Sequence, residues 1–211
     1  MPSLVGSEMC IRDRNAAFWS QTITAWDEIV APNELSVQGG ERTTAVQGLT
    51  LDYQRFMSDA LLGAYRLEVD AIRAEIPDAV ITTNLMGTYR PLDYREWAPH
   101  LDVIAWDSYP SPQDTPAAIA LRHTLMRSLK GGQPFMLMEQ TPSQQNWQAY
   151  NALKRPGVMR LQSWQAVAHG ADAVMFFQMR RSVGACEKFH GAVMEHHGRT
   201  DTRVFREVAQ L

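Results

Sequence analysis

One stretch of the chain joins a carboxylate to the end of an apolar run. Residues 134–138 read PFMLM and Glu139 follows directly, in the segment PFMLMEQTPSQQNW that ends at Trp147. A short apolar run of this kind is typical of a buried strand, so Glu139 would stand at a strand tip with a fixed backbone. A carboxylate held in this way is suited to nucleophilic attack or proton transfer. The competing interpretation is a strand-end glutamate in an ordinary salt bridge.

Tryptophan is the unusual component of the composition. In a core, an indole is large apolar filler; in a cleft, it is a flat platform for the C–H face of a sugar ring. Core packing explains each tryptophan taken singly, and we interpret three of them, Trp26, Trp97 and Trp164, in this way. The presence of several beside polar strand ends favours a cleft for others. The six tryptophans are Trp19, Trp26, Trp97, Trp106, Trp147 and Trp164.

Composition and charge exclude several functions. The 211 residues are 45% hydrophobic, which is enough for a substantial core. A formal net charge of −3 without a long Lys/Arg run argues against a nucleic-acid surface. No stretch reaches the ~18 apolar residues of a membrane span, and no signal-peptide core is visible. The two cysteines, Cys10 and Cys186, form no CxxC pair. We therefore expect a cytoplasmic protein without a cofactor or metal.

Helix and strand patterns alternate along the chain. Apolar residues at helical spacing predict a long helix that Pro77 stops, and Thr115 before Pro116 marks the start of another. Gly170 closes a third. The predicted helices span 49–75, 92–98, 116–130, 157–169 and the last residues of the chain. Four apolar runs predict strands over 79–87, 101–110, 134–140 and 171–179.

The predicted strands favour a parallel sheet. They are continuous apolar runs rather than alternating ones, as in sheets covered on both faces. Each ends in polar residues, among them Asn84, Asp107 and Glu139, and β/α barrels place their working residues at these carboxyl ends. A doubly wound sheet is the alternative, but no glycine-rich phosphate loop follows any strand. The fold class is therefore α/β, and four strands correspond to half of a (β/α)8 TIM barrel.

A family resemblance rests on six motifs that occur in a fixed order. They are AFWSQTITAWDEI, LDYQRFMSDALLGAY, TTNLMG, VIAWDSYP, FMLMEQTPSQQNW and MFFQMRRSVGACEKFHGAVMEHHG. Together they resemble the glycoside hydrolase family 42 β-galactosidases, from about Asn15 to about Gly198. The resemblance implies that residues 15–211 are the second half of the catalytic barrel, strands five to eight. Residues 1–14 show no family pattern and would be a tail, foreign to the rest.

The resemblance implies a retaining glycosidase that hydrolyses terminal non-reducing β-D-galactosides. Glu139, at the end of the seventh barrel strand, would be the nucleophile and form a galactosyl-enzyme that water then hydrolyses. A retaining mechanism needs a second carboxyl group about 5–5.5 Å away as acid/base. In this family that residue should lie upstream of the first motif, and the Asn33-Glu34 pair is a poor candidate because it lies outside any predicted strand. We therefore expect this stretch alone to lack the acid/base and to be inactive.

Two other functional classes stay open at this point. The chain could be a galactoside-binding or scaffold protein that kept the sugar site and lost the acid. It could also be part of a different glycosidase on the same barrel, because a fold alone does not fix a function.

The resemblance also implies a galactose pocket. Trp147 would form a wall beside the sugar, while Glu187 and His190 would hydrogen-bond its hydroxyl groups and so select galactose. Asn84 and Asp107 would support the site from neighbouring strand ends. The competing interpretations are a structural role for His190 and core packing for Phe177. The implied substrate-binding residues are Trp19, Tyr109, Trp147, Phe177, Glu187 and His190.

The same resemblance bears on partners. The substrate partner would be a β-galactoside, with neither nucleic acid nor membrane as a partner, and the parent enzyme would be a homo-oligomer, a trimer. The zinc cluster of some members would lie upstream, and no residue here supports a metal. One departure from the family falls at Met179, where members often have tryptophan, which puts the shape of the pocket in doubt.

Overall fold

The computed structural model describes residues 14–19, 21–32 and 47–211. These residues form two compact units, one of the described residues up to 70 with 90–93 and one of residues 71–89 with 94–211. Cys10, the Asn33-Glu34 pair and most of the 1–14 tail lie outside the described residues.

The first unit has a small apolar core. Trp19, at the end of the short helix η1 (Asn15–Trp19), is buried with Ile23 and Leu49. Leu49 belongs to helix α2 (Gln47–Glu75), which confirms the helix predicted over 49–75 and begins slightly earlier. A short 3-10 helix, η2 (Trp26–Glu28), lies between these segments in the sequence.

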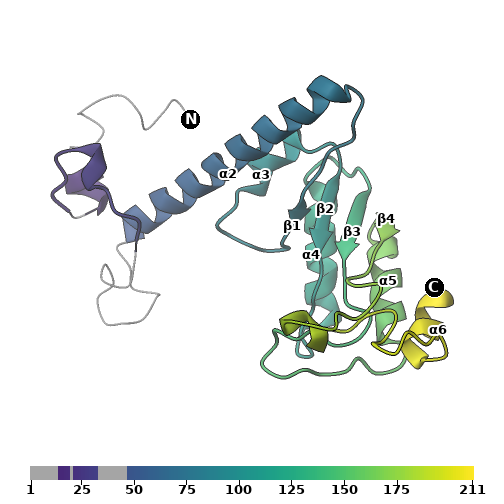
Figure 1. The fold of residues 1–211 in the computed structure, drawn as a ribbon. Coiled ribbons are helices and arrows are strands. Elements are labelled where there is room, and N and C mark those ends of the chain that lie inside the picture. The colour runs from purple at the N-terminus through teal and green to yellow at the C-terminus, as the bar shows by residue number, and fades with distance from the viewer. Residues whose placement is uncertain (1–13, 20, 33–46) are drawn as a thin grey trace. The chain divides into compact units, whose positions relative to one another are not determined.

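The second unit contains a four-stranded parallel sheet (Figure 1). Its strands follow one another in chain order, so each is paired with the strand before it in the sequence. A doubly wound sheet would reverse direction at a switch point, whereas a barrel advances in one direction. The strand order therefore supports the barrel prediction. The strands are β1 (Asn84–Leu85), β2 (Ile104–Asp107), β3 (Phe135–Glu139) and β4 (Ala171–Val174).

All four predicted strands are present, but each is shorter than predicted. The difference is largest for β1, because the residues before it are held partly by side chains. The amide of Ile81 donates to Oδ2 of Asp102 at 2.7 Å, and the hydroxyl of Thr82 donates to the carbonyl of Val103 at 2.6 Å. These bonds replace part of the backbone ladder, so regular pairing begins only at Asn84.

The crossover helices begin and end where the sequence indicates. Thr115 caps α4 (Pro116–Ser128) by accepting a bond from the amide of Ala118 at 3.2 Å, and α5 (Val158–Ala168) is followed by Gly170 at a φ of 100°. A β-carbon at Gly170 would lie 2.9 Å from the side chain of Arg127, so glycine suits both the backbone and the space. The remaining elements are α3 (Tyr94–Trp97), η4 (Ala98–His100), η5 (Cys186–Phe189) and α6 (Arg203–Ala209).

Helices α4 and α5 cover one side of the sheet. Figure 1 shows them side by side behind the strands, with α4 packed on β2 and α5 on β4. His123 of α4 is buried, with its ring stacked on Phe135 and edge-on to Trp106. Burial lowers the pKa of His123 to about 4, so this histidine is a neutral core residue at physiological pH.

The interpretation of three tryptophans as core is right for one of them. Trp97 is buried, but Trp26 is 42% exposed and Trp164 is 52% exposed, so the core prediction is wrong for both. In α5, Met159, Ser163 and Ala166 are the buried positions, and Trp164 falls on the opposite face of that helix.

Candidate functional site

Glu139 ends β3 and is held by a neighbouring strand end. The hydroxyl of Tyr109 donates a hydrogen bond to Oε2 of Glu139 at 2.7 Å, and the amide of Ser108 donates to the carbonyl of Glu139 at 2.8 Å. Burial, and then the bond to Glu139, raise the pKa of Tyr109 above its ordinary value of 10. The phenol therefore stays protonated and remains a donor to the carboxylate.

A second carboxyl group lies at the tip of the adjacent strand. Asp107 pairs with Glu139 in the register of β2 and β3, and its Oδ1 accepts a bond from Nδ2 of Asn84 at 2.9 Å. Burial, and then the charge of Glu139, raise the pKa of Asp107 from 3.8 to about 6, although the Asn84 bond opposes this shift. Asn84 and Asp107 therefore form a polar group directly beside Glu139.

This raised pKa predicts a pH-dependent stability. Between pH 4 and 6 the folded protein binds more protons at Asp107 than the unfolded chain, so the free energy of unfolding falls as pH rises through this window. Asp107→Asn removes the charge and keeps the acceptor for Asn84. We expect the variant to be more stable than the wild type by about 1 kcal/mol at pH 7.5, after allowance for solvent screening, and equal to it near pH 4. Urea denaturation at both pH values measures this, and an equal difference at both would contradict it.

Aromatic rings surround the hydroxyl that holds Glu139. The ring of Tyr109 packs edge-on against Trp147, with centroids 5.6 Å apart, and against His190 at 5.8 Å. Phe177 also packs edge-on against His190, with centroids 5.0 Å apart. The structure thus brings four of the predicted site residues into one cluster with Glu139, from the loops after β2, β3 and β4.

His190 is fixed on several sides. It is 1% exposed, and its Nδ1 lies 2.9 Å from the carbonyl oxygen of Gly191, which can only accept; Nδ1 therefore carries the proton. Arg181 donates from Nε to the carbonyl of His190 and from Nη1 to Glu195, both at 2.7 Å. With Nδ1 so engaged, Nε2 of a neutral His190 is left as an acceptor.

Glu187 and Trp19 have different surroundings. Glu187 is an exposed residue of η5, and its charge contributes to the raised pKa of Tyr109, which places its carboxylate within electrostatic reach of the cluster. Trp19 belongs to the first unit, where its buried indole donates from Nε1 to Oδ2 of Asp52 at 3.0 Å. Its predicted place in the galactose pocket stays a prediction.

Hydrogen bonds from amide side chains join the loops of the site. These side chains were not identified from the sequence as part of the site. Nδ2 of Asn146 donates to the carbonyl of Cys186, and Nδ2 of Asn151 donates to the carbonyl of Phe189, both at 2.8 Å. These bonds join the loop after β3 to the loop after β4. The amide-rich segment that follows Glu139 in the sequence was the available signal.

The same two loops approach each other closely at Gly191. A larger residue there should therefore lower the stability of the fold. A β-carbon there would lie 2.9 Å from the backbone N and O of Gln144 and from the hydroxyl of Thr141. We expect Gly191→Ala to lower the free energy of unfolding by about 1–3 kcal/mol, because backbone must move to admit the methyl group. Urea denaturation measures the loss. Gly184→Ala is the matched control, since nothing lies within 4 Å of its β-carbon position; an equal effect of both changes would refute the packing argument.

Two kinds of feature are absent from the described residues. No group of three or more His, Cys, Asp or Glu side chains in the described ranges is placed to hold a metal ion. None of the helices in the described part of the chain is both long and apolar enough to cross a membrane.

Comparison with known proteins decides the family. The model of the glycoside hydrolase 42 family, described as beta-galactosidase, matches residues 12–211. The chain belongs to this family. The resemblance inferred from the six motifs is therefore confirmed, and so is the assignment to glycoside hydrolases.

Similar proteins agree with this membership. A beta-galactosidase of Planococcus sp. strain SOS Orange is 62% identical over 199 residues, covering 93% of this chain and 29% of the relative. One of Lactobacillus acidophilus strain NCFM is 51% identical over 203 residues, covering 93% of this chain and 30% of the relative. The chain thus spans less than a third of the length of these curated relatives.

Solved structures of the family share the fold. The crystal structure of a beta-galactosidase from Bacillus circulans sp. alkalophilus superposes with a TM-score of 0.89 at 58% identity, covering 99% of this chain and 31% of that chain. The crystal structure of a beta-galactosidase from Rahnella sp. R3 superposes with a TM-score of 0.84 at 45% identity, covering 96% of this chain and 30% of that chain. These matches confirm the fold class as α/β and the four-stranded sheet as part of a TIM barrel.

Proposed function

We propose that this chain supplies the nucleophile half of a retaining β-galactosidase site. The observation that carries the proposal is the bond from the hydroxyl of Tyr109 to Oε2 of Glu139, at the tip of a parallel barrel strand. A carboxylate with one oxygen held by a donor has its second oxygen directed by that contact. Family membership and the β-galactosidase names of the relatives support the substrate class.

The proposed reaction has two displacements at the anomeric carbon. A free oxygen of Glu139 forms a bond to that carbon as the bond to the aglycone oxygen breaks, through an oxocarbenium-like transition state. A second carboxylic acid, from outside the described residues, protonates the departing oxygen. Water then attacks the galactosyl ester from the opposite face, gives its proton to the second carboxylate and releases Glu139. The two inversions retain the β configuration.

The aromatic cluster would bind the galactose ring. In this proposal Trp147 and Phe177 pack against C–H faces, and Nε2 of His190 accepts a bond from a sugar hydroxyl. Glu187 accepts from a further hydroxyl. A buried acceptor that loses its hydroxyl partner is strongly penalised, so a sugar without the matching hydroxyl would be rejected.

The partners, cellular location and oligomeric state of the whole protein are part of the same proposal. A net charge of −3 and the absence of a basic run support a protein that acts on a galactoside rather than on nucleic acid or a membrane. We place it in the cytoplasm and expect the whole enzyme to be a homo-oligomer.

A chimera tests the proposal. The matched stretch of the Planococcus sp. strain SOS Orange beta-galactosidase would be replaced by this chain, which is 62% identical to it. We expect this chimera to hydrolyse nitrophenyl β-galactoside with retention at the anomeric carbon, detected by NMR of the first-formed sugar. A folded chimera that binds galactosides without turnover would support the galactoside-binding alternative instead.

A further inference from the structure

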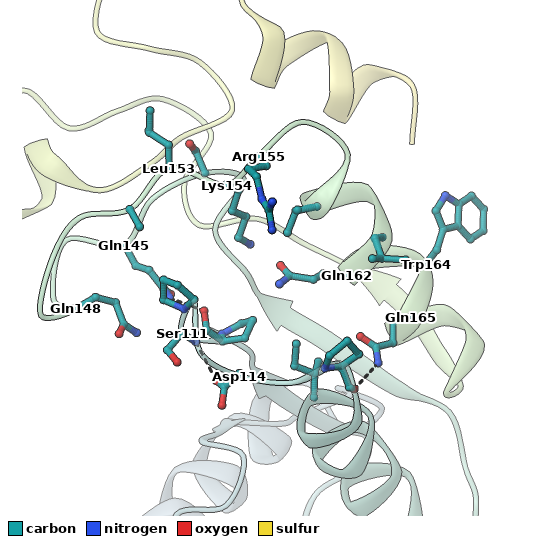
Figure 2. Close-up of a pocket in the computed structure, with 18 of the residues that line it drawn as sticks. Ser111, Asp114, Gln145, Gln148, Leu153, Lys154, Arg155, Gln162, Trp164 and Gln165 are labelled. Carbon is teal, nitrogen blue, oxygen red and sulfur yellow. Dashed lines mark hydrogen bonds between the residues drawn. The ribbon is translucent and has the colours of Figure 1, made fainter.

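A cavity lies beside helices α4 and α5, and Glu139 is not among its lining residues. Its volume is about 640 Å³, and it opens between these helices and the loops that precede them (Figure 2). Sites for small molecules typically occupy 300–1,000 Å³. None of the side chains proposed to act on galactose lines this cavity.

Two cationic side chains converge in the cavity without a carboxylate partner. Figure 2 shows Lys154 and Arg155 both directed toward the amide group of Gln162. Within the described ranges no acidic side chain forms an ion pair with either cation. Asp114, the carboxylate among the lining residues, is already paired with Arg122 at 3.1 Å. A protonated Lys154 and the exposed Arg155 are therefore not neutralised by any carboxylate in the described part of the chain.

Burial makes Lys154 respond to an anion. Its Nζ donates to the carbonyl of Thr141 at 2.6 Å, and an ammonium group has three donors, so others remain. Burial lowers the pKa of Lys154 to about 7, because the charged form is poorly solvated. An anion beside Nζ would favour the protonated form and would be accompanied by proton uptake.

Two buried amide oxygens beside the same cavity have no protein donor within the described ranges. Oε1 of Gln145 and Oε1 of Gln162 are buried, and no donor in the described part of the chain reaches them. The orientation of Gln145, which is 5% exposed, is fixed because its Nε2 donates to the carbonyl of Pro110 at 2.7 Å. Carbonyl-type oxygens in such positions are matched by hydroxyl groups of a ligand.

We propose that this cavity binds a small anionic polyol of monosaccharide size. The anionic group, a carboxylate or a phosphate, lies between Lys154 and Arg155, and hydroxyl groups donate to Gln145 and Gln162. Apolar lining residues such as Ile119 provide a surface for the C–H face of the molecule. This site is independent of the galactosidase proposal, since none of its groups contacts Glu139.

Titration calorimetry on the full chain tests the proposal. The probes are glucose 6-phosphate and glucuronate, with glucose and inorganic phosphate as separate controls for the ring and the bare anion. We expect at least one anionic sugar to bind with a Kd below ~1 mM, and both controls to bind at least about tenfold more weakly. Which of the two sugars binds tighter distinguishes phosphate from carboxylate.

Variants assign the binding to the cavity. Lys154→Met keeps the length of the side chain and should weaken binding about 10- to 100-fold, and Gln162→Leu should weaken it about tenfold. Lys188→Met, at an exposed position over the ring of Phe189, is the matched control and should change nothing. Circular dichroism checks that each variant is folded.

The pH dependence distinguishes a binding role from a structural one. Lys154 shares the cavity with Arg155, Tyr150 and Asp114, which is paired with Arg122, and Arg203, which is paired with Glu207, donates from Nη2 to the carbonyl of Lys154. Affinity should fall between pH 6.5 and 8.5 in the wild type and stay constant in Lys154→Met. No binding at about 10 mM of either anionic sugar would overturn the proposal. So would equal binding by the Lys154 variant, or binding of bare phosphate as tight as that of the sugar phosphate, which would mean an adventitious anion only.

Discussion

The Planococcus chimera carrying Glu139→Gln should retain less than about one ten-thousandth of the kcat/KM of the unmutated chimera toward an aryl β-galactoside. Glutamine keeps the shape of the side chain and can still accept the hydrogen bond from Tyr109. It cannot form the ester bond to the anomeric carbon, so the first displacement fails. The loss should appear in kcat, because sugar contacts from other residues remain.

Azide shows whether the lost group was the nucleophile. With Glu139→Ala, azide can enter the space of the carboxylate and displace the aglycone once, which gives galactosyl azide of inverted, α configuration. Restored β-galactosyl azide would assign Glu139 the acid/base role and contradict the proposal. Glu96→Gln, at an exposed position of α3, is the matched control and should keep full activity.

Tyr109→Phe should lower kcat/KM of the chimera by about 10- to 100-fold. The variant loses the 2.7 Å bond to Oε2 of Glu139, and hydrogen bonds to charged groups contribute about 1.5–3 kcal/mol. The ring contacts with Trp147 and His190 do not need the hydroxyl, so the aromatic cluster should persist. The reason for the loss is therefore misplacement of the carboxylate rather than loss of the pocket.

Steady-state kinetics separate these two causes. Loss of positioning lowers kcat and leaves KM nearly unchanged, whereas loss of the sugar wall raises KM. Tyr150→Phe removes an exposed hydroxyl that contacts Gln113 and should be silent. If Tyr109→Phe is equally silent, Tyr109 does not position the nucleophile.

The fold could be predicted largely because its signals are local. The apolar run before Glu139 marks β3, Thr115 caps α4, and Gly170 has the positive φ that ends α5. These features act within a few residues of sequence, where pattern and backbone preference determine structure. The predicted ends of the strands were less accurate. The start of β1 depends on a hydrogen bond from the amide of Ile81 to the side chain of Asp102, 21 residues away in the sequence.

The site depends on contacts that no local pattern encodes. Tyr109 and Glu139 are 30 residues apart, and their bond follows from the register of neighbouring strands. Arg181, which fixes the backbone of His190, sits in a loop whose sequence shows no element. The exposure of Trp164 depends on which face of α5 meets the sheet, and an indole fits either face by composition.

Trapping of the galactosyl-enzyme tests the central claim, that Glu139 is the nucleophile, most directly. The full chain would be incubated with 2,4-dinitrophenyl 2-deoxy-2-fluoro-β-D-galactoside, whose leaving group needs no protonation and whose fluorine slows hydrolysis of the ester. Intact-mass and peptide mass spectrometry then locate any sugar adduct. We expect one adduct per chain, on Glu139, and none in Glu139→Gln. An adduct on another carboxylate such as Asp107, or an unmodified Glu139 in a chain that binds galactose, would contradict it.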